Sequence, residues 1–207
     1  MVKEKIRETK EKIMSKNDYS KWYKITDYIL FFFTFAFVGW VWEICLILVQ
    51  TGKLVNRGVL LGPWLPIYGS GGVLILLFLR KAFNKPVLTF FLTTILCTVV
   101  EYFTSWYLEV TKGVRWWDYS GYFLNINGRV CLEGAIVFGL GGCAIVYFLA
   151  PKFSKLYVKA SNKVLIPICV ILVSLFIVDL IHSNKHPNTG EGITASIGTS
   201  YNVSQSR

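Results

Sequence analysis

The sequence contains few charged residues and few of the side chains that usually carry metal or redox chemistry. Charged residues make up 16% of the 207 positions, whereas soluble domains average about a quarter. There are two histidines, His182 and His186, and the five cysteines form no CxxC pair. A metal site needs grouped Cys, His or acidic ligands, and a disulfide framework needs regularly spaced cysteines. We therefore expect no metal ion, no cofactor and no disulfide framework, with cysteines that are small buried apolar residues.

The sequence also lacks a nucleotide-binding loop. Gly69-Ser70-Gly71-Gly72 is glycine-rich, but it lacks the Lys-Ser/Thr pair that contacts phosphate and magnesium in a Walker A motif. The predicted membrane region contains no histidine and no recognisable nucleophile with its base. An ATP-driven activity would therefore need a separate ATPase subunit, and the pattern does not indicate an enzyme.

Long apolar stretches dominate what the sequence does contain. Hydrophobic residues make up 54% of the chain, and an α-helix needs about 20 apolar residues to cross a bilayer. Four stretches meet or nearly meet this length: Ile25–Gln50, Pro86–Glu109, Val130–Ala150 and Val164–Ile181. We predict an all-α fold, a polytopic transmembrane helix bundle of about five spans embedded in the lipid bilayer.

A fifth apolar stretch, Val59–Phe83, begins irregularly because glycines and prolines crowd its first third. We expect a broken or re-entrant segment over Gly58–Gly72, with a regular helix from about Ile67. Irregular backbone at membrane depth is tolerated only where protein groups or water in a cavity satisfy its polar atoms. This segment is therefore expected to lie beside such groups.

The positive charge is concentrated on one side of the predicted spans. The net charge is +10, and 15 of the 22 Lys and Arg residues lie in residues 1–24 and in the loops 80–85 and 152–163. Because positive loops stay in the cytoplasm, we expect a plasma-membrane protein with a cytoplasmic N-terminus and an extracytoplasmic C-terminus. The charge is not gathered on one accessible face, so nucleic-acid binding is not expected. The chain divides into a basic cytosolic segment, the transmembrane domain 25–183 and a polar tail, 184–207, expected to be disordered.

Three glutamates lie inside the predicted spans, where ionisable groups usually face protein or water. The helical rise of about 1.5 Å per residue places Glu43, Glu101 and Glu133 in the outer half of the membrane. Arg57 and Arg129 stand at the outer mouth, each beside glycine and asparagine. Our hypothesis is a polar cavity open to the outside. The alternative is a set of structural ion pairs that hold the helices together.

Other polar residues extend this candidate site. Glu109 shares a four-residue spacing with Ser105 and Glu101, which gives one helix a polar stripe. Arg129 and Glu133 can pair if the helix begins early enough. In the aromatic loop Arg115–Arg129, Asp118 is placed to cap a short helix and Asn127-Gly128 predicts a turn; the loop is either a lid or an interfacial anchor. The predicted cavity or substrate-binding residues are Glu43, Arg57, Glu101, Glu109, Asp118, Asn127, Arg129 and Glu133.

Two segments of the sequence look alike. Asn56–Gly62 compares with Asn127–Gly134, and each leads into a run with a glycine cluster, Gly69/Gly71/Gly72 and Gly139/Gly141/Gly142. Such a pattern suggests a parallel repeat of two helix pairs, an arrangement found among transporters.

Four of these segments carry a family resemblance. They are GWVWE (Gly39–Glu43), RGVLLGPWLPIYGSGG (Arg57–Gly72), EYFTSWYLE (Glu101–Glu109) and WDYSGYFLNINGRVCLEG (Trp117–Gly134). Over about residues 25–150 the chain resembles the putative ABC-transporter type IV, or CmpB-like, membrane proteins. The resemblance implies a permease and supplies no catalytic residues. We expect the chain to depart from the family beyond about Lys163.

These patterns favour a membrane transport component with an outward-facing polar cavity, whose candidate partners are an ATPase subunit and further copies of the chain. One alternative is an intramembrane enzyme acting on a lipid or lipid-linked substrate, with the outer carboxylates as acid and base. Another is a non-catalytic membrane sensor or assembly partner.

Overall fold

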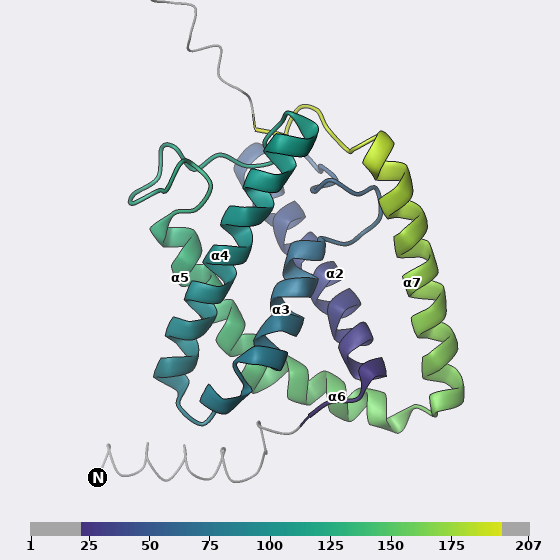
Figure 1. Ribbon diagram of the computed structural model, residues 1–207. Helices are drawn as coiled ribbons and strands as arrows, with labels where there is room; N and C mark the ends of the chain where they lie inside the picture. The colour runs from purple at the N-terminus through teal and green to yellow at the C-terminus, as the bar shows by residue number, and fades with distance from the viewer. Residues whose placement is uncertain (1–21, 196–207) are drawn as a thin grey trace, which may run out of the picture.

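The computed structural model describes residues 22–195; residues 1–21 and 196–207, with most of the predicted cytosolic segment, lie outside the described part. The described chain is helical, with one isolated β-bridge between Ile126 and Val130. Its elements are α2 (Ile25–Thr51), α3 (Pro66–Phe78), the 3-10 turn η1 (Arg80–Ala82), α4 (Pro86–Lys112), α5 (Leu132–Ala144), the π-helical segment η2 (Ile145–Leu149), α6 (Ala150–Lys159) and α7 (Asn162–Lys185) (Figure 1).

The helices run in alternating directions between the two ends of the bundle (Figure 1). α2 and α4 end at Gly52 and Gly113, whose φ angles of 72° and 73° are left-handed, a conformation that glycine adopts at little cost. Within residues 22–195, four helical stretches are long and apolar enough to cross a bilayer, with Leu132–Lys159 counted as one. The predicted all-α, multi-span architecture is confirmed at this level.

The fifth predicted span is a shorter helix that follows an irregular entry. α3 has 13 residues, about 20 Å at the helical rise, and Pro66 occupies its first turn, where the missing N–H costs little. The entry lies deep in the bundle, because the Leu65 N–H donates to the Ala36 carbonyl of α2 at 3.0 Å. The break at the predicted prolines is therefore present, while a complete fifth crossing stays a prediction.

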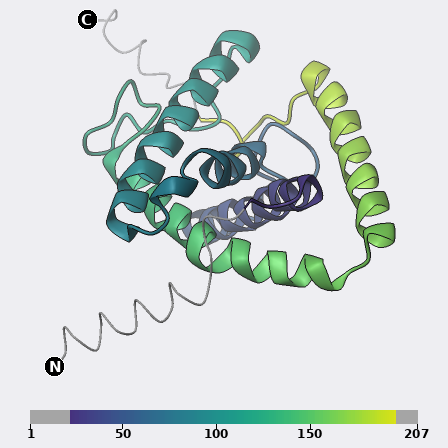
Figure 2. The same ribbon diagram turned by 60° about the horizontal axis from the view of Figure 1, so that its bottom comes forward.

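The predicted loop Lys152–Lys163 is mostly helical, contrary to expectation. α5 continues through η2 into α6, which runs across the lower end of the bundle toward α7 (Figure 2). Pro151 lies in the first turn of α6, a position compatible with a helix. Phe153 and Tyr157 pack against the core around Phe31, whereas the lysines of this segment are exposed. Contacts of one helix face with the core therefore order this segment, which its charged residues had led us to predict as a loop.

Two close helix pairs, α2 with α3 and α4 with α5, form most of the bundle. In each pair a Gly-x-Gly-Gly run lies against the preceding helix: a Cβ on Gly72 would meet the ring of Phe35, and one on Gly142 would meet Thr93. α2 and α4 have 27 residues each, and α3 and α5 have 13 each. These shared features support the predicted repeat, although superposition of the two pairs stays a prediction.

The segment after α7 folds back over the loops. The Asn188 side chain donates to the carbonyls of Asn56 (2.9 Å) and Gly58 (3.1 Å). The Trp116 indole in turn donates to the Asn188 carbonyl at 3.1 Å. Residues 186–195, part of the predicted polar tail, are thus hydrogen-bonded to the two loops that follow α2 and α4.

Candidate functional site

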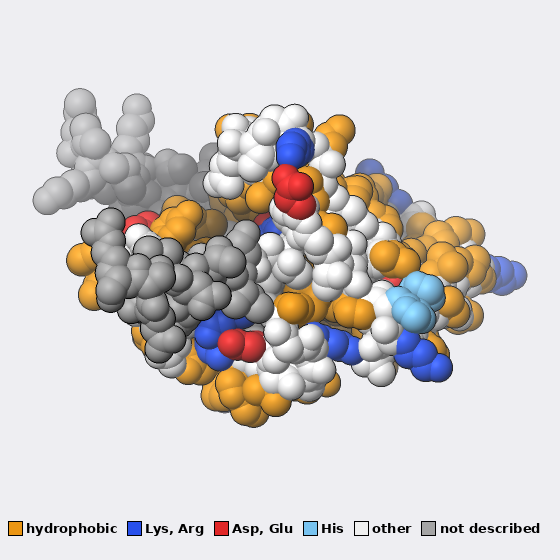
Figure 3. All heavy atoms as spheres, turned by 90° about the horizontal axis from the view of Figure 1, so that it is seen from above, with side chains coloured by type: hydrophobic (Ala, Val, Ile, Leu, Met, Phe, Trp, Pro, Cys, Tyr) orange, Lys and Arg blue, Asp and Glu red, His pale blue; other side chains and the backbone are white. Residues whose placement is uncertain are grey.

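The charged residues of the candidate site gather at the end of the bundle where α2 and α4 end and α5 begins. Seen from this end, acidic and basic side chains lie among the loops, with hydrophobic side chains around them (Figure 3). Glu43 lies eight residues before the end of α2, and Glu101 lies eleven before the end of α4, depths of about 12 and 16 Å. We define the polar layer as Glu43, Arg57, Tyr68, Glu101, Ser105, Glu109, Tyr119 and Arg129.

Glu43 connects α2 to both α3 and the loop between them. The Tyr68 hydroxyl of α3 donates to Glu43 Oε1 at 2.7 Å, and Arg57 Nε lies 3.6 Å from Glu43 Oε2. The Arg57 side chain, 14% exposed, also donates to the carbonyls of Gly192 and Ile193. Pairing and hydrogen bonding of this kind offset the desolvation of a charge.

Arg129 pairs with the polar stripe of α4. Its Nη2 lies 2.6 Å from Glu109 Oε2, and its side chain is 11% exposed. Its Nη1 donates to Ser105 Oγ at 3.3 Å. Glu109 accepts a second charged hydrogen bond, from Arg115 Nε at 2.8 Å. Ser105 and Glu109, four residues apart on α4, therefore both contact Arg129. This gives the predicted polar stripe a polar partner.

The condition for pairing Arg129 with Glu133, a helix that begins before Arg129, is not met. α5 begins only at Leu132, after Cys131 in an extended conformation, so Arg129 does not lie on the same helix as Glu133. The Arg129 side chain turns toward α4, and Glu133 is exposed.

Glu101 is the most deeply buried acid of the layer, with 4% of the residue exposed. The Tyr119 hydroxyl donates to its Oε1 at 3.2 Å, and its Oε2 makes no hydrogen bond with the described residues. Burial, reinforced by Glu101, raises the pKa of Tyr119 above its ordinary value. The Tyr119 hydroxyl therefore remains a neutral donor toward the carboxyl group.

Asp118 and Asn127 shape the aromatic loop instead of lining the polar layer. Asp118 Oδ1 accepts the Ser120 N–H at 3.0 Å and the Ser120 hydroxyl at 2.6 Å; the hydroxyl bond lowers the pKa of Asp118. No helix lies between α4 and α5, so the expected helix cap is wrong and Asp118 caps a turn. Asn127, with φ 54°, forms the predicted turn and donates to the Tyr102 hydroxyl at 2.9 Å.

Sequence reasoning missed Asp179, the acid that α7 contributes. Its carboxylate accepts the backbone N–H groups of Leu61 (3.1 Å) and Gly62 (2.9 Å), and the indole N–H of Trp64 (2.8 Å). It thereby satisfies donors of the irregular entry to α3. The signal was present, because Asp179 is a lone acid within the apolar stretch predicted as the last span.

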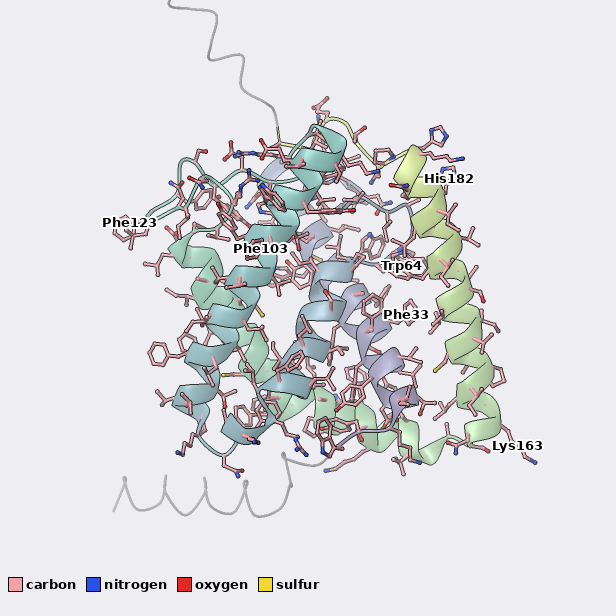
Figure 4. The ribbon with its side chains drawn as sticks, viewed as in Figure 1. Phe33, Trp64, Phe103, Phe123, Lys163 and His182 are labelled. Atoms are coloured by element: carbon pink, nitrogen blue, oxygen red, sulfur yellow. The ribbon has the colours of Figure 1, made fainter. Side chains whose placement is uncertain are left out.

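A separate apolar groove of about 460 Å³ lies between α2, α3 and α7. Phe33 of α2 and Trp64, just before α3, lie on the side of the α2–α3 pair that faces α7 (Figure 4). Phe33 and Phe176 of α7 line the groove and contact each other. Along α2, Phe33 is about 15 Å from Glu43, so the groove is distinct from the polar layer. Among the described residues, no group of three or more His, Cys, Asp or Glu side chains is placed to hold a metal ion.

Four helical stretches long and apolar enough to cross a bilayer, with ion pairs between helices and loops at one end, define a multi-pass α-helical membrane protein. The chain belongs to the family described as putative ABC-transporter type IV (CmpB), which matches residues 30–184. The match extends through α7 as far as residue 184, so the expected departure from the family beyond Lys163 is wrong for the last span; residues 185–207 lie outside the match. No curated protein and no solved structure matches the chain.

Proposed function

We propose that the chain is the membrane-spanning component of a transporter, and that the polar layer lines the route of a polar solute. The observation that carries this proposal is a pair of little-exposed arginines, Arg57 and Arg129, each ion-paired with a carboxylate of the preceding long helix. Charged groups at membrane depth commonly mark substrate or ion pathways. The broken entry to α3 lies beside the layer through Tyr68, and discontinuous helices often form transporter binding sites.

The proposed orientation places the polar layer on the extracytoplasmic side of the plasma membrane. The exposed lysines of α6 and Lys163 in the first turn of α7 lie at the opposite end of the bundle (Figure 4), where positive charge favours the cytoplasm. The sequence contains no Walker A motif, so ATP hydrolysis would come from a separate subunit at that cytoplasmic end. Co-purification with an ATPase tests this partner, and the mass of the purified complex tests for further copies of the chain.

Access of water to the polar layer distinguishes a solute route from sealed ion pairs. Ser105 is 3% exposed and accepts a hydrogen bond from Arg129. In a background without the native cysteines, we expect Ser105→Cys to react with a membrane-impermeant thiol reagent added from outside. The matched control is Phe103→Cys on the same helix, because Phe103 is 59% exposed on the surface that faces lipid.

A route is supported if the Ser105→Cys variant reacts and the Phe103→Cys variant does not. If the Ser105→Cys variant is folded but stays unreactive from both sides, the polar layer only holds helices together and the transport proposal fails. Protection of that cysteine by one class of solute would identify the class that the route accepts.

The apolar groove favours a second candidate, an intramembrane enzyme acting on a lipid or lipid-linked substrate. Its lining from α2, α3 and α7 suits an acyl chain. Phe33 in the groove lies about 15 Å along α2 from Glu43. This distance counts against the candidate, because it separates a bound acyl chain from the carboxylates that would act as acid and base. A change in the membrane lipids of a strain lacking the protein, with normal solute uptake, would favour this candidate.

A further inference from the structure

Glu101 differs from the other acids of the polar layer in having no cationic partner. Glu43 pairs with Arg57, and Glu109 pairs with two arginines. Glu101 forms no ion pair within residues 22–195, although only 4% of it is exposed. A buried carboxylate without a cation or a full set of hydrogen bonds is costly, whereas burying the neutral protonated acid costs much less.

The hydrogen bonds of Glu101 fit a carboxyl group that binds a proton. Oε1 accepts the Tyr119 hydroxyl at 3.2 Å, which leaves Oε2 buried and without a hydrogen-bond partner among the described residues. Thr98 Oγ1, one helical turn earlier on α4, is also buried without a partner. Two unpartnered polar atoms therefore share one face of the same helix at this depth.

The groups that interact with Glu101 carry no positive charge to compensate an ionised carboxylate. They are Glu43 of α2, Tyr68 of α3, Cys97 of α4, Tyr119 of the aromatic loop and Cys131 just before α5. Arg129, one helical turn away at Ser105, is paired with Glu109 instead. Glu43 adds a like charge. The surroundings thus favour a neutral carboxyl group at this position.

We propose that Glu101 is a reversible proton-binding site whose carboxyl group is held by the Tyr119 hydroxyl. In the arrangement described, the carboxyl group holds the proton. On release, the carboxyl O–H bond breaks, the proton passes to water and the carboxylate remains. Tyr119 is suited to hold the carboxyl group in either state, because its hydroxyl donates to Oε1 and its backbone N–H is fixed by the Gly128 carbonyl at 2.7 Å. The proposal concerns this site alone and does not depend on transport, although in a transporter this proton would be the coupling ion.

Infrared spectroscopy of the purified full chain in lipid tests the proposal directly, since a protonated carboxyl has a C=O stretching band that a carboxylate lacks. We expect a band at neutral pH that disappears as the pH rises and is absent from the Glu101→Gln variant. The control Glu133→Gln changes an exposed acid in the first turn of α5 and should leave the band unchanged.

A band that persists in Glu101→Gln, or its absence from the unmodified protein at neutral pH, would overturn the proposal. A second variant covers the case in which Glu101→Gln does not fold. Tyr119→Phe removes the donor to Oε1 and should shift the frequency of the band, because the carboxyl loses a hydrogen bond. If the band is unshifted in Tyr119→Phe, it comes from a carboxyl group other than Glu101, and the proposal fails. Either failure leaves the water-access test of the transport route unaffected.

Discussion

The carboxylate of Asp179 accepts the indole N–H of Trp64 at 2.8 Å, which links α7 to the segment that enters α3. The same carboxylate accepts two backbone N–H groups of this segment. Lipid offers no hydrogen bonds to an irregular backbone, so a neighbouring helix must supply the acceptor. α7 lies at the side of the bundle (Figure 2), and this acid is a specific polar contact between it and the α2–α3 pair.

Removing the carboxylate should therefore destabilise the entry to α3. We expect Asp179→Ala to lower the free energy of unfolding by about 2 kcal/mol, because three donors of the entry segment and the Ser183 hydroxyl lose their acceptor in a partly buried place. Ser183→Ala, which removes only one donor to the same carboxylate, should cost clearly less. Hydrogen exchange followed by mass spectrometry should show faster exchange over residues 58–65 in Asp179→Ala. Unchanged exchange there would contradict the structural role of Asp179.

The two partners of the Glu109–Arg129 pair should respond unequally to substitution. Arg129→Gln leaves Glu109 paired with Arg115, whereas Glu109→Gln leaves the little-exposed Arg129 without a carboxylate. We expect Glu109→Gln to cost about 2 kcal/mol and Arg129→Gln less, because an uncompensated buried charge is the expensive state. The double variant should recover part of the loss. Denaturation of all four proteins gives the coupling free energy, expected at about 1 kcal/mol. Additive losses would show that the pair contributes no net coupling.

The helical spans could be predicted from apolar length, and the break before α3 from Pro63 and Pro66. The gathering of Glu43 and Arg57 was predictable as well, because both lie near the same end of neighbouring elements. The pairing of Arg129 was not, since it depends on the residue at which α5 begins. The deep position of Tyr119 beside Glu101 was also beyond prediction, because a loop without periodicity gives no signal for where its side chains point.

The turn at Asp118 should keep its structure over the whole physiological pH range. The hydrogen bond from the Ser120 hydroxyl holds the pKa of Asp118 below the ordinary 3.8. A lowered pKa means that the turn's contribution to stability is fully present above about pH 4 and is lost as the pH falls through the lower folded-state value. The chemical shift of the Ser120 amide, followed by NMR, should be constant from about pH 7 to 5 and change only below. A shift change centred between about pH 7 and 5 would contradict a lowered pKa of Asp118. As the control, Asp118→Asn should abolish the shift change at low pH.

Neighbouring glycines on α5 should respond oppositely to alanine. A Cβ on Gly142 would meet the Thr93 side chain of α4, while a Cβ on Gly141 meets nothing nearby. Alanine is intrinsically the better helix former by about 1 kcal/mol, so Gly141→Ala should be neutral or slightly stabilising. Gly142→Ala should destabilise the protein by about 1–3 kcal/mol, because α4 and α5 must move apart or Thr93 must shift. Thermal denaturation of the two variants in detergent measures the difference in their stability. Both carry the same Gly→Ala change, so the difference reports the position alone. Equal effects of both substitutions would mean that the glycine run does not set the separation of α4 and α5. Close packing at glycine would then no longer support the likeness between the α4–α5 and α2–α3 pairs.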